Sequence, residues 1–220
     1  AAVQACWASL FEPRAIYYRH QQGFDHFKVG IAVPVQKMVA SETSGVMFTI
    51  EPVTSDTNKI VIEAIYGLGE GLVSGEVNPD LYIIDRKDLS ISSKRISRQE
   101  RQLTRNPATN GKDANTWQPL PPSTQNQQKL TDDDILQLAR LGEQIESHYQ
   151  SPQDIEWARE DNKFYIVQTR PVTTIKETTG VEPEINAPVL LTGDAASPGL
   201  ASGTVKIISD ASQIDQVHNG

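Results

Sequence analysis

The sequence predicts an α+β fold in which a mostly antiparallel sheet carries helices. Three observations support this prediction. Short apolar, β-branched runs alternate with polar turns along the chain, which is typical of strands. One long segment repeats its apolar residues with helical spacing. The chain has 220 residues, enough for one large or two small domains with a buried core.

The apolar runs are predicted as strands in chain order. Two strands of one sheet are expected at 29–39 and 45–50, and a third at 60–66. Residues 81–85 and 91–96 are expected to form a hairpin that turns through 86–89. The polar stretch 104–130, rich in Asn, Gln, Pro and Thr, is predicted as a long surface loop.

Helices are predicted at two places. The first 23 residues have a helical apolar stripe, with Pro13 marking a break or a new first turn. A second helix is expected to begin after Thr131 as N-cap and to run to about Tyr149, since three aspartates follow Thr131 where the helix dipole favours negative charge.

The segment DIEWAREDNKFYIVQTRP is predicted as a hairpin with a three-residue loop at 161–163. A two-residue loop would instead place Glu156 opposite Val167. The odd loop separates polar from apolar side chains better. Its pairs are Glu160 with Phe164, Ala158 with Ile166, Glu156 with Gln168, and Asp154 with Arg170. The opposite, apolar face would carry Ile155, Trp157, Tyr165 and Val167.

Two carboxylates, an amide oxygen and an arginine on one sheet face suit a particular chemistry. Mg²⁺ takes oxygen ligands, commonly one or two carboxylates together with substrate phosphates. Arginine matches a phosphoryl group and stabilises its charge during transfer. From the residues alone, however, the favoured interpretation is a solvated face with a cross-strand Asp–Arg pair, because polar strand faces are common.

Composition narrows the class of protein. The net charge is −8 and no run of basic residues occurs, which disfavours nucleic acid as a partner. No apolar stretch approaches the roughly 20 residues that span a bilayer, so no membrane partner is expected. The single cysteine, Cys6, excludes an internal disulfide and fits a reducing compartment. The sequence therefore predicts a soluble, cytoplasmic protein.

Four ordered strings resemble the ATP-grasp domain of the pyruvate phosphate dikinase family, which includes phosphoenolpyruvate synthases and rifampin phosphotransferases. They are VPVQKMVASETSGVMFTIEPVT, EAIYGLGEGLVSGEVNPDLYIID, DIEWARE…FYIVQTRP and GDAASPGLASGTVKII. The match is closest to the phosphoenolpyruvate synthase branch. The resemblance implies the C-terminal subdomain of an ATP-grasp fold over 1–175, a linker over 176–188, and the first strands of a swivelling phosphohistidine domain over 189–220.

The resemblance also implies roles for individual residues. Glu156 and Gln168 correspond to the ligands of Mg²⁺-ATP, and Arg170 to the residue that faces the transferable phosphates. Asp154 occupies the accompanying acidic position. Gln36, Lys37 and Met38 correspond to the adenine side of the pocket, although Gln36 also reads as an ordinary strand residue and Met38 as core. Glu63 and Glu70 could line the cleft without belonging to the metal site.

In this family the phosphoryl group passes from ATP to a histidine and then to pyruvate, giving phosphoenolpyruvate, AMP and phosphate. The accepting histidine motif does not occur in this sequence, so the chain is expected to be inactive alone. A homodimer of the complete protein is compatible with the resemblance. The alternatives are a rifampin-type phosphotransferase and a non-catalytic binding module, and the latter predicts loss of the metal pair.

The glycine-rich string GLGEGLVSG invites comparison with phosphate-binding loops. It lacks the Lys-Ser/Thr ending of a Walker loop and the spacing of a dinucleotide fingerprint. A tight turn that packs against the sheet is therefore the favoured interpretation.

Overall fold

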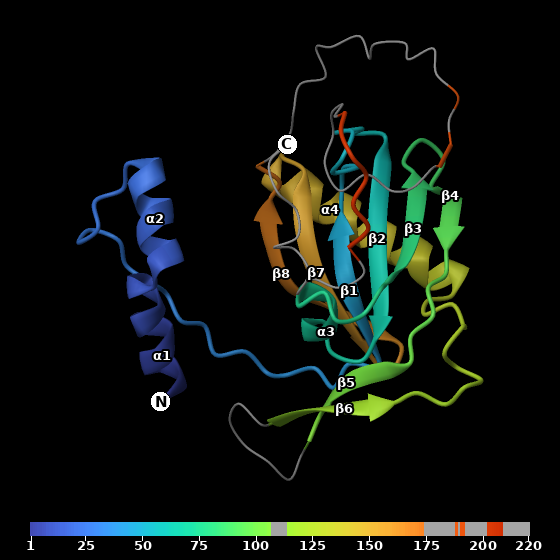
Figure 1. The fold of residues 1–220 in the computed structure, drawn as a ribbon, viewed down its shortest axis with the longest axis horizontal. Helices are drawn as coiled ribbons and strands as arrows, with labels where there is room; N and C mark the ends of the chain where they lie inside the picture. Colours follow the sequence, from blue (N-terminus) through green and yellow to red (C-terminus); the bar gives the residue numbers. More distant parts are fainter. Residues whose placement is uncertain (107–113, 174–187, 189, 192–201, 209–220) are drawn as a thin grey trace. The chain divides into compact units, whose positions relative to one another are not determined.

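The computed structural model describes residues 1–106, 114–173, 188, 190–191 and 202–208 (Figure 1). The chain divides into two compact units, Ala1–Met38 and Val39–Gly220. Within the described ranges, no helix has the length and apolar character needed to cross a membrane.

The first unit is helical. It contains α1 (Ala2–Ala8), the 3-10 helix η1 (Ser9–Phe11) and α2 (Pro13–Gln22). The predicted break at Pro13 is confirmed, because Pro13 is the first residue of α2, where its missing N–H costs nothing. Gly23 ends α2 in the left-handed conformation at φ +69°, which glycine adopts without strain.

The second unit is built on a six-stranded sheet whose paired strands all run antiparallel. Its strands are β1 (Thr43–Phe48), β2 (Lys59–Tyr66), β3 (Asp80–Asp85), β4 (Ser90–Arg95), β7 (Gln153–Glu160) and β8 (Lys163–Pro171). Their order across the sheet is β4-β3-β2-β1-β7-β8 (Figure 1). An α+β fold with a mostly antiparallel sheet is therefore confirmed.

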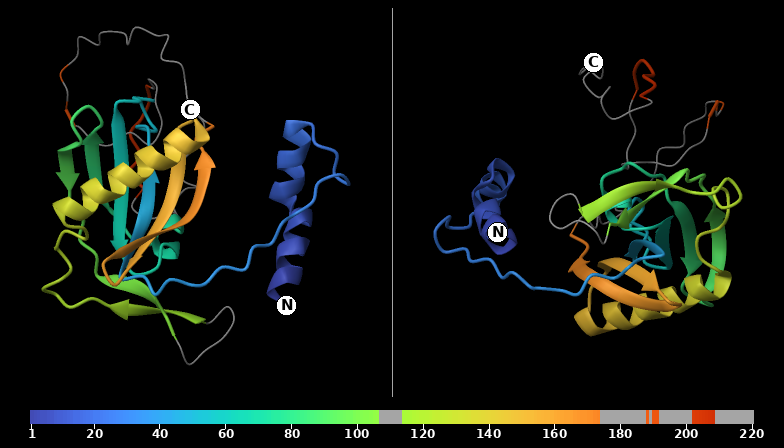
Figure 2. Two further views of the ribbon diagram at one scale, coloured as in Figure 1. Left: turned by 180° about the vertical axis from the view of Figure 1, so that it is seen from behind. Right: turned by 90° about the horizontal axis from the view of Figure 1, so that it is seen from below.

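One face of this sheet is covered by α4 (Asp132–Tyr149), which crosses the strands in the left view of Figure 2. The predicted N-cap is confirmed, since Thr131 and Asp134 form a reciprocal capping box. Apolar side chains from the helix and five strands form the core beneath α4: Met47, Ile60, Ile62, Tyr82, Ile84, Ile91, Ile135, Leu138, Ile155 and Trp157. Gly142 lets the helix approach β1, because a Cβ there would lie 2.9 Å from the sulfur of Met47.

The strand predicted at 29–39 is wrong, because these residues have no strand assignment and most are exposed. The apolar, β-branched composition of the segment satisfies strand propensity, but a strand also needs a neighbour to pair with. The nearest strand in sequence, β1, already has β2 and β7 on its two sides.

The long surface loop predicted at 104–130 is also wrong. It contains most of a two-stranded ribbon, β5 (Arg101–Arg105) paired with β6 (Asn115–Pro119). The Arg101 guanidinium lies 4.3 Å from the centre of the Trp117 ring, so a cation–π contact between the two strands stabilises the ribbon. The same stretch supplies Lys129, which is buried against Asp80 of β3.

The linker expected at 176–188, apart from residue 188, and most of the unit expected at 189–220 lie outside the described residues. Residues 202–208 are described and have no assigned strand. The boundaries of these two segments stay predictions.

Candidate functional site

The turn between β7 and β8 has two residues and not three, so the predicted loop is wrong. Glu160 pairs with Lys163, leaving only Asp161 and Asn162 in the turn. Both residues have positive φ, 51° and 60°, which is the conformation of the two-residue hairpin turn whose twist matches the strands. The predicted pairs of Glu160 with Phe164 and of Ala158 with Ile166 fail for this reason.

A β-bulge restores the pairing further along the hairpin. Trp157 pairs with Ile166, whereas the residue before it in the chain, Glu156, pairs with Gln168. Val167, between Ile166 and Gln168, is therefore an extra residue in β8. The predicted pairs of Glu156 with Gln168 and of Asp154 with Arg170 are therefore confirmed.

The two-residue turn also changes which apolar residues of β8 reach the core. Ile155 and Trp157 are buried against α4 as predicted. From β8, however, Phe164 and Ile166 pack against this core in place of Tyr165 and Val167. Val167 is 39% exposed. The shorter turn shifts the alternation of β8 by one residue as far as the bulge.

The four polar residues of the hairpin share the sheet face opposite α4, called the outer face below. Asp154 and Glu156 alternate with the buried Ile155 and Trp157, so they point away from α4. On β8, Thr169 donates a hydrogen bond to the buried Gln153. Its neighbours Gln168 and Arg170 therefore lie on the outer face, where both are exposed.

Strand register extends this arrangement across the sheet in one row, called the site row. It runs Gln168, Glu156, Val46, Glu63, Leu81 and Arg95 from β8 to β4. Glu63 thus lies two strands from Glu156, a backbone separation of about 10 Å. The row brings together residues that are more than a hundred positions apart in sequence.

Asp154 and Arg170 form an ion pair beside the site row. The Arg170 Nε and one terminal nitrogen donate to Oδ2 of Asp154 at 2.8 and 2.7 Å. The arginine side chain is 69% exposed and the aspartate side chain 13%. An exposed guanidinium held from behind by a carboxylate keeps N–H donors available for an anion.

The three residues expected on the adenine side, Gln36, Lys37 and Met38, end the first unit and are exposed. The structure therefore places them in the unit that does not contain the hairpin, and their role stays a prediction.

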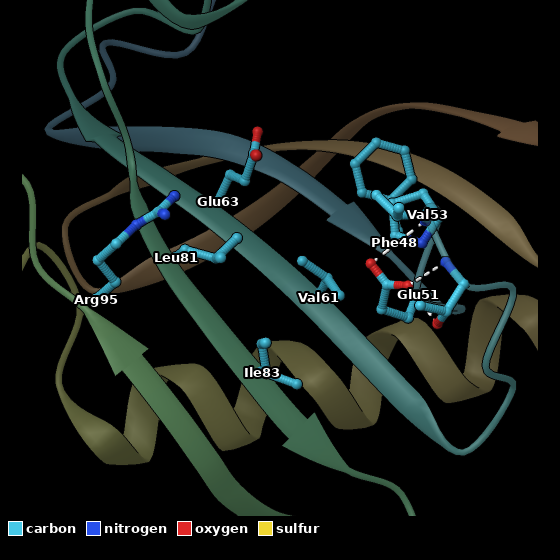
Figure 3. A pocket seen from close by; sticks show the side chains of 10 residues that line it. Phe48, Glu51, Val53, Val61, Glu63, Leu81, Ile83 and Arg95 are labelled. Carbon is cyan, nitrogen blue, oxygen red and sulfur yellow. Dashed lines mark hydrogen bonds between the residues drawn. The ribbon is translucent and has the colours of Figure 1, made fainter. Parts of the chain in front are cut away.

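A pocket of about 350 Å³ adjoins the site row on the outer face (Figure 3). Figure 3 shows Glu63 and Arg95 at one end, Leu81, Val61 and Ile83 along the floor, and Phe48 beside the loop at the other end. The loop is held by Glu51, whose carboxylate accepts hydrogen bonds from the backbone of Val53 and Thr54.

Sequence reasoning assigned no role to Arg95 and did not include Glu63 in the metal site. Burial raises the pKa of Glu63; the charge of Arg95 lowers this pKa and that of Asp154 raises it, with a net rise. The available signal was a single charged residue inside the apolar run IVIEAIY. In contrast, Glu70 lies on α3 (Glu70–Val73), where it accepts a hydrogen bond from Asn115 of β6.

The glycine-rich segment begins with a turn at Gly67, as predicted, but its middle forms the short helix α3, which the sequence did not predict. Gly67 has φ +87° and a Cβ there would lie 2.4 Å from the carbonyl oxygen of Leu103. Ser44 donates to the Gly67 carbonyl at 2.6 Å. The segment thus joins β1 to the β5–β6 ribbon, which explains the glycine without a phosphate.

The donor set of the hairpin fits a magnesium ion that arrives with its own phosphate ligands. Glu156 offers a carboxylate and Gln168 an amide oxygen on paired positions. Among the residues that the structure describes, no group of three His, Cys, Asp or Glu side chains could hold a metal ion. Mg²⁺ bound to nucleotide commonly needs only one or two protein oxygens.

Comparison with known proteins identifies the family. The family model described as "Pyruvate phosphate dikinase, AMP/ATP-binding domain" matches residues 1–187. The chain is 49% identical to the probable phosphoenolpyruvate synthase of Methanocaldococcus jannaschii and 48% identical to the phosphoenolpyruvate synthase of Pyrococcus furiosus, over 99% of its length in both cases. It is 47% identical over 79% of its length to the rifampicin phosphotransferase of Bacillus subtilis.

The chain spans only a part of these relatives, namely 18%, 28% and 19% of their lengths. The match of the family model nevertheless covers the whole first unit and the second unit as far as residue 187. This protein therefore belongs to the pyruvate phosphate dikinase family, through its AMP/ATP-binding domain.

Proposed function

We propose that the outer face of the β7–β8 hairpin holds the Mg²⁺ and phosphates of ATP in a phosphotransferase of the phosphoenolpyruvate synthase type. The observation that carries this proposal is the cross-strand pairing of Glu156 with Gln168 and of Asp154 with Arg170. Glu156 and Gln168 would supply protein oxygens to the ion. The ion neutralises negative charge on the phosphates when it is bound.

Arg170 acts on the phosphates in this proposal, and Asp154 orients it. A guanidinium placed beside a transferable phosphoryl group stabilises the charge that develops on its oxygens. Asp154 fixes the guanidinium plane through the two N–H donors at 2.8 and 2.7 Å. Gln36, Lys37 and Met38 would contact the adenine end of the nucleotide.

For the complete protein we infer transfer from ATP to a histidine and then to pyruvate, with AMP and phosphate as the other products. Relatives named phosphoenolpyruvate synthase match 99% of the chain, whereas the rifampicin phosphotransferase matches 79%. This difference favours pyruvate over a drug hydroxyl as acceptor. The non-catalytic alternative is disfavoured, since both members of the metal pair are present. A homodimer and a cytoplasmic location stay predictions.

The test is calorimetric titration of the complete natural polypeptide that carries this sequence with ATP, at fixed Mg²⁺. Glu156→Ala is expected to weaken ATP binding by at least about tenfold, as loss of a metal ligand does. Glu160→Ala is the matched control, because Glu160 lies four residues along the same strand, beside the turn. It should leave the affinity unchanged. Equal affinities for Glu156→Ala and the wild-type protein would reject the proposal.

A further inference from the structure

The hairpin that carries the candidate site contains two different strand registers. From the turn to the bulge, the pairs run from Glu160–Lys163 to Trp157–Ile166. Beyond the bulge, they run from Glu156–Gln168 to Gln153–Pro171. The change of register falls directly beside the proposed metal pair.

A uniform ladder would destroy the site. If the register at the turn continued without a bulge, Gln168 would pair with Ile155 and Arg170 with Gln153. Ile155 and Gln153 are fully buried on the α4 side, and paired residues of an antiparallel ladder share a face. Gln168 and Arg170 would then point into the core, away from Glu156 and Asp154, at the cost of burying a charge.

Each register is fixed by its own contacts. On the turn side, Asp161 and Asn162 have the positive φ of a two-residue turn. There, the ring of buried Trp157 lies 5.7 Å from that of Phe164, edge to face. On the other side, Arg170 is bonded to Asp154, and Thr169 donates to Gln153 at 2.9 Å. One surplus residue must therefore be accommodated between these two sets of contacts.

We infer that the bulge at Val167 shifts the register of β8 by one residue, so that Gln168 and Arg170 lie on the outer face with Glu156 and Asp154. Val167 is thus the surplus residue that the bulge takes up, and the number of residues in β8 decides which face Gln168 and Arg170 occupy. This inference rests on the proposed function, because the register matters for activity only if Glu156, Gln168, Asp154 and Arg170 together bind Mg²⁺-ATP.

The inference makes an unusual prediction about deletions. Deleting Val167 gives a regular ladder that retains the Glu156–Gln168 and Asp154–Arg170 pairs, so the site should survive. Deleting Ile166 instead allows Val167 to take its place opposite Trp157, again with the site intact. Deleting both residues moves Gln168 opposite Trp157 and turns it towards α4.

The experiment compares these three deletions in the complete natural polypeptide, using ATP titration with and without Mg²⁺ and thermal unfolding. Each single deletion should fold and change the Mg²⁺-dependent affinity for ATP by less than about tenfold. The double deletion should reduce this affinity by about a hundredfold or more. Val167→Ile is the control that retains the bulge, and it should resemble the wild-type protein.

Three results would overturn the inference. A Val167 deletion that fails to fold, or that folds and loses the Mg²⁺ response, would show that the bulge does more than adjust register. A double deletion that keeps the Mg²⁺ response would show that register does not control the site. Wild-type binding that responds neither to Mg²⁺ nor to Glu156→Ala would instead reject the proposed function itself, so the two failures are distinguishable.

Discussion

Two aspartates of the same sheet hold a basic side chain in opposite ways. Asp80 on β3 binds Lys129 at 2.6 Å, and both side chains are fully buried. Its oxygens also accept hydrogen bonds from the Tyr82 hydroxyl and from the backbone N–H groups of Ser97 and Lys129. Asp154 on β7 holds Arg170, which remains 69% exposed.

The difference between the Asp80–Lys129 and Asp154–Arg170 pairs indicates which of the two can contact a ligand. Each oxygen of Asp80 accepts two hydrogen bonds, so this pair serves to join β3 to the segment before α4. The Asp154–Arg170 pair fixes a guanidinium at the surface, where it can still meet an anion. Burial and complete hydrogen bonding therefore indicate a structural pair, and exposure beside the proposed metal ligands makes the Asp154–Arg170 pair the candidate for a functional one.

The largest effect is expected when the buried pair is broken. Lys129→Ala leaves the charge of Asp80 buried without its lysine, which should lower the free energy of unfolding by about 3–5 kcal/mol. Denaturant unfolding monitored by circular dichroism measures it. A loss below about 1 kcal/mol, typical of exposed pairs, would mean that the two pairs do not differ as described.

The matching substitution in the exposed pair should have the opposite profile. Arg170→Ala is expected to change the free energy of unfolding by less than about 1 kcal/mol, because exposed pairs contribute little. ATP-dependent phosphoryl transfer by the complete protein should nevertheless fall by about a hundredfold or more. Unchanged turnover, measured at saturating ATP, would remove Arg170 from the site.

The smallest effect concerns Glu63, the half-buried carboxyl of the site row. Since its pKa in the folded state is raised, its protonated form is favoured by folding, and this stabilisation is lost as pH rises through the folded pKa. Glu63→Gln keeps a neutral side chain at every pH. It should raise the melting temperature slightly at pH 7, and the gain should vanish at pH 4. A gain in melting temperature that is independent of pH would contradict the raised pKa of Glu63.

The sequence predicted those elements whose local chemistry and tertiary role agree. Thr131 with its following aspartates caps α4 as expected, and the polar alternation on the two strands of the hairpin predicts the pairs Glu156–Gln168 and Asp154–Arg170. The segment 29–39 failed because strand propensity does not supply a pairing partner. The ribbon of β5 and β6 was missed because most of its residues are polar, and only the fold places Arg101 over the Trp117 ring.

The turn of the hairpin shows a more specific limit of sequence reasoning. The pairing of the site residues was predicted correctly, but from a three-residue loop that does not exist. A bulge at Val167 achieves the same pairing, and no residue type in FYIVQTRP marks its position. The bulge lies between two cross-strand contacts of the hairpin, the packing of Trp157 on Phe164 and the Asp154–Arg170 pair, which form only when the hairpin folds.

The most direct test of the site is a double-mutant cycle on the paired residues Glu156 and Gln168. Affinity for ATP at fixed Mg²⁺ is measured for the complete protein with Glu156→Ala, with Gln168→Ala and with both. If the two side chains hold one ion, the double variant should bind ATP about as weakly as the weaker single variant, because the ion is already lost. Fully additive losses, or no loss in either single variant, would contradict a shared Mg²⁺ site on this face.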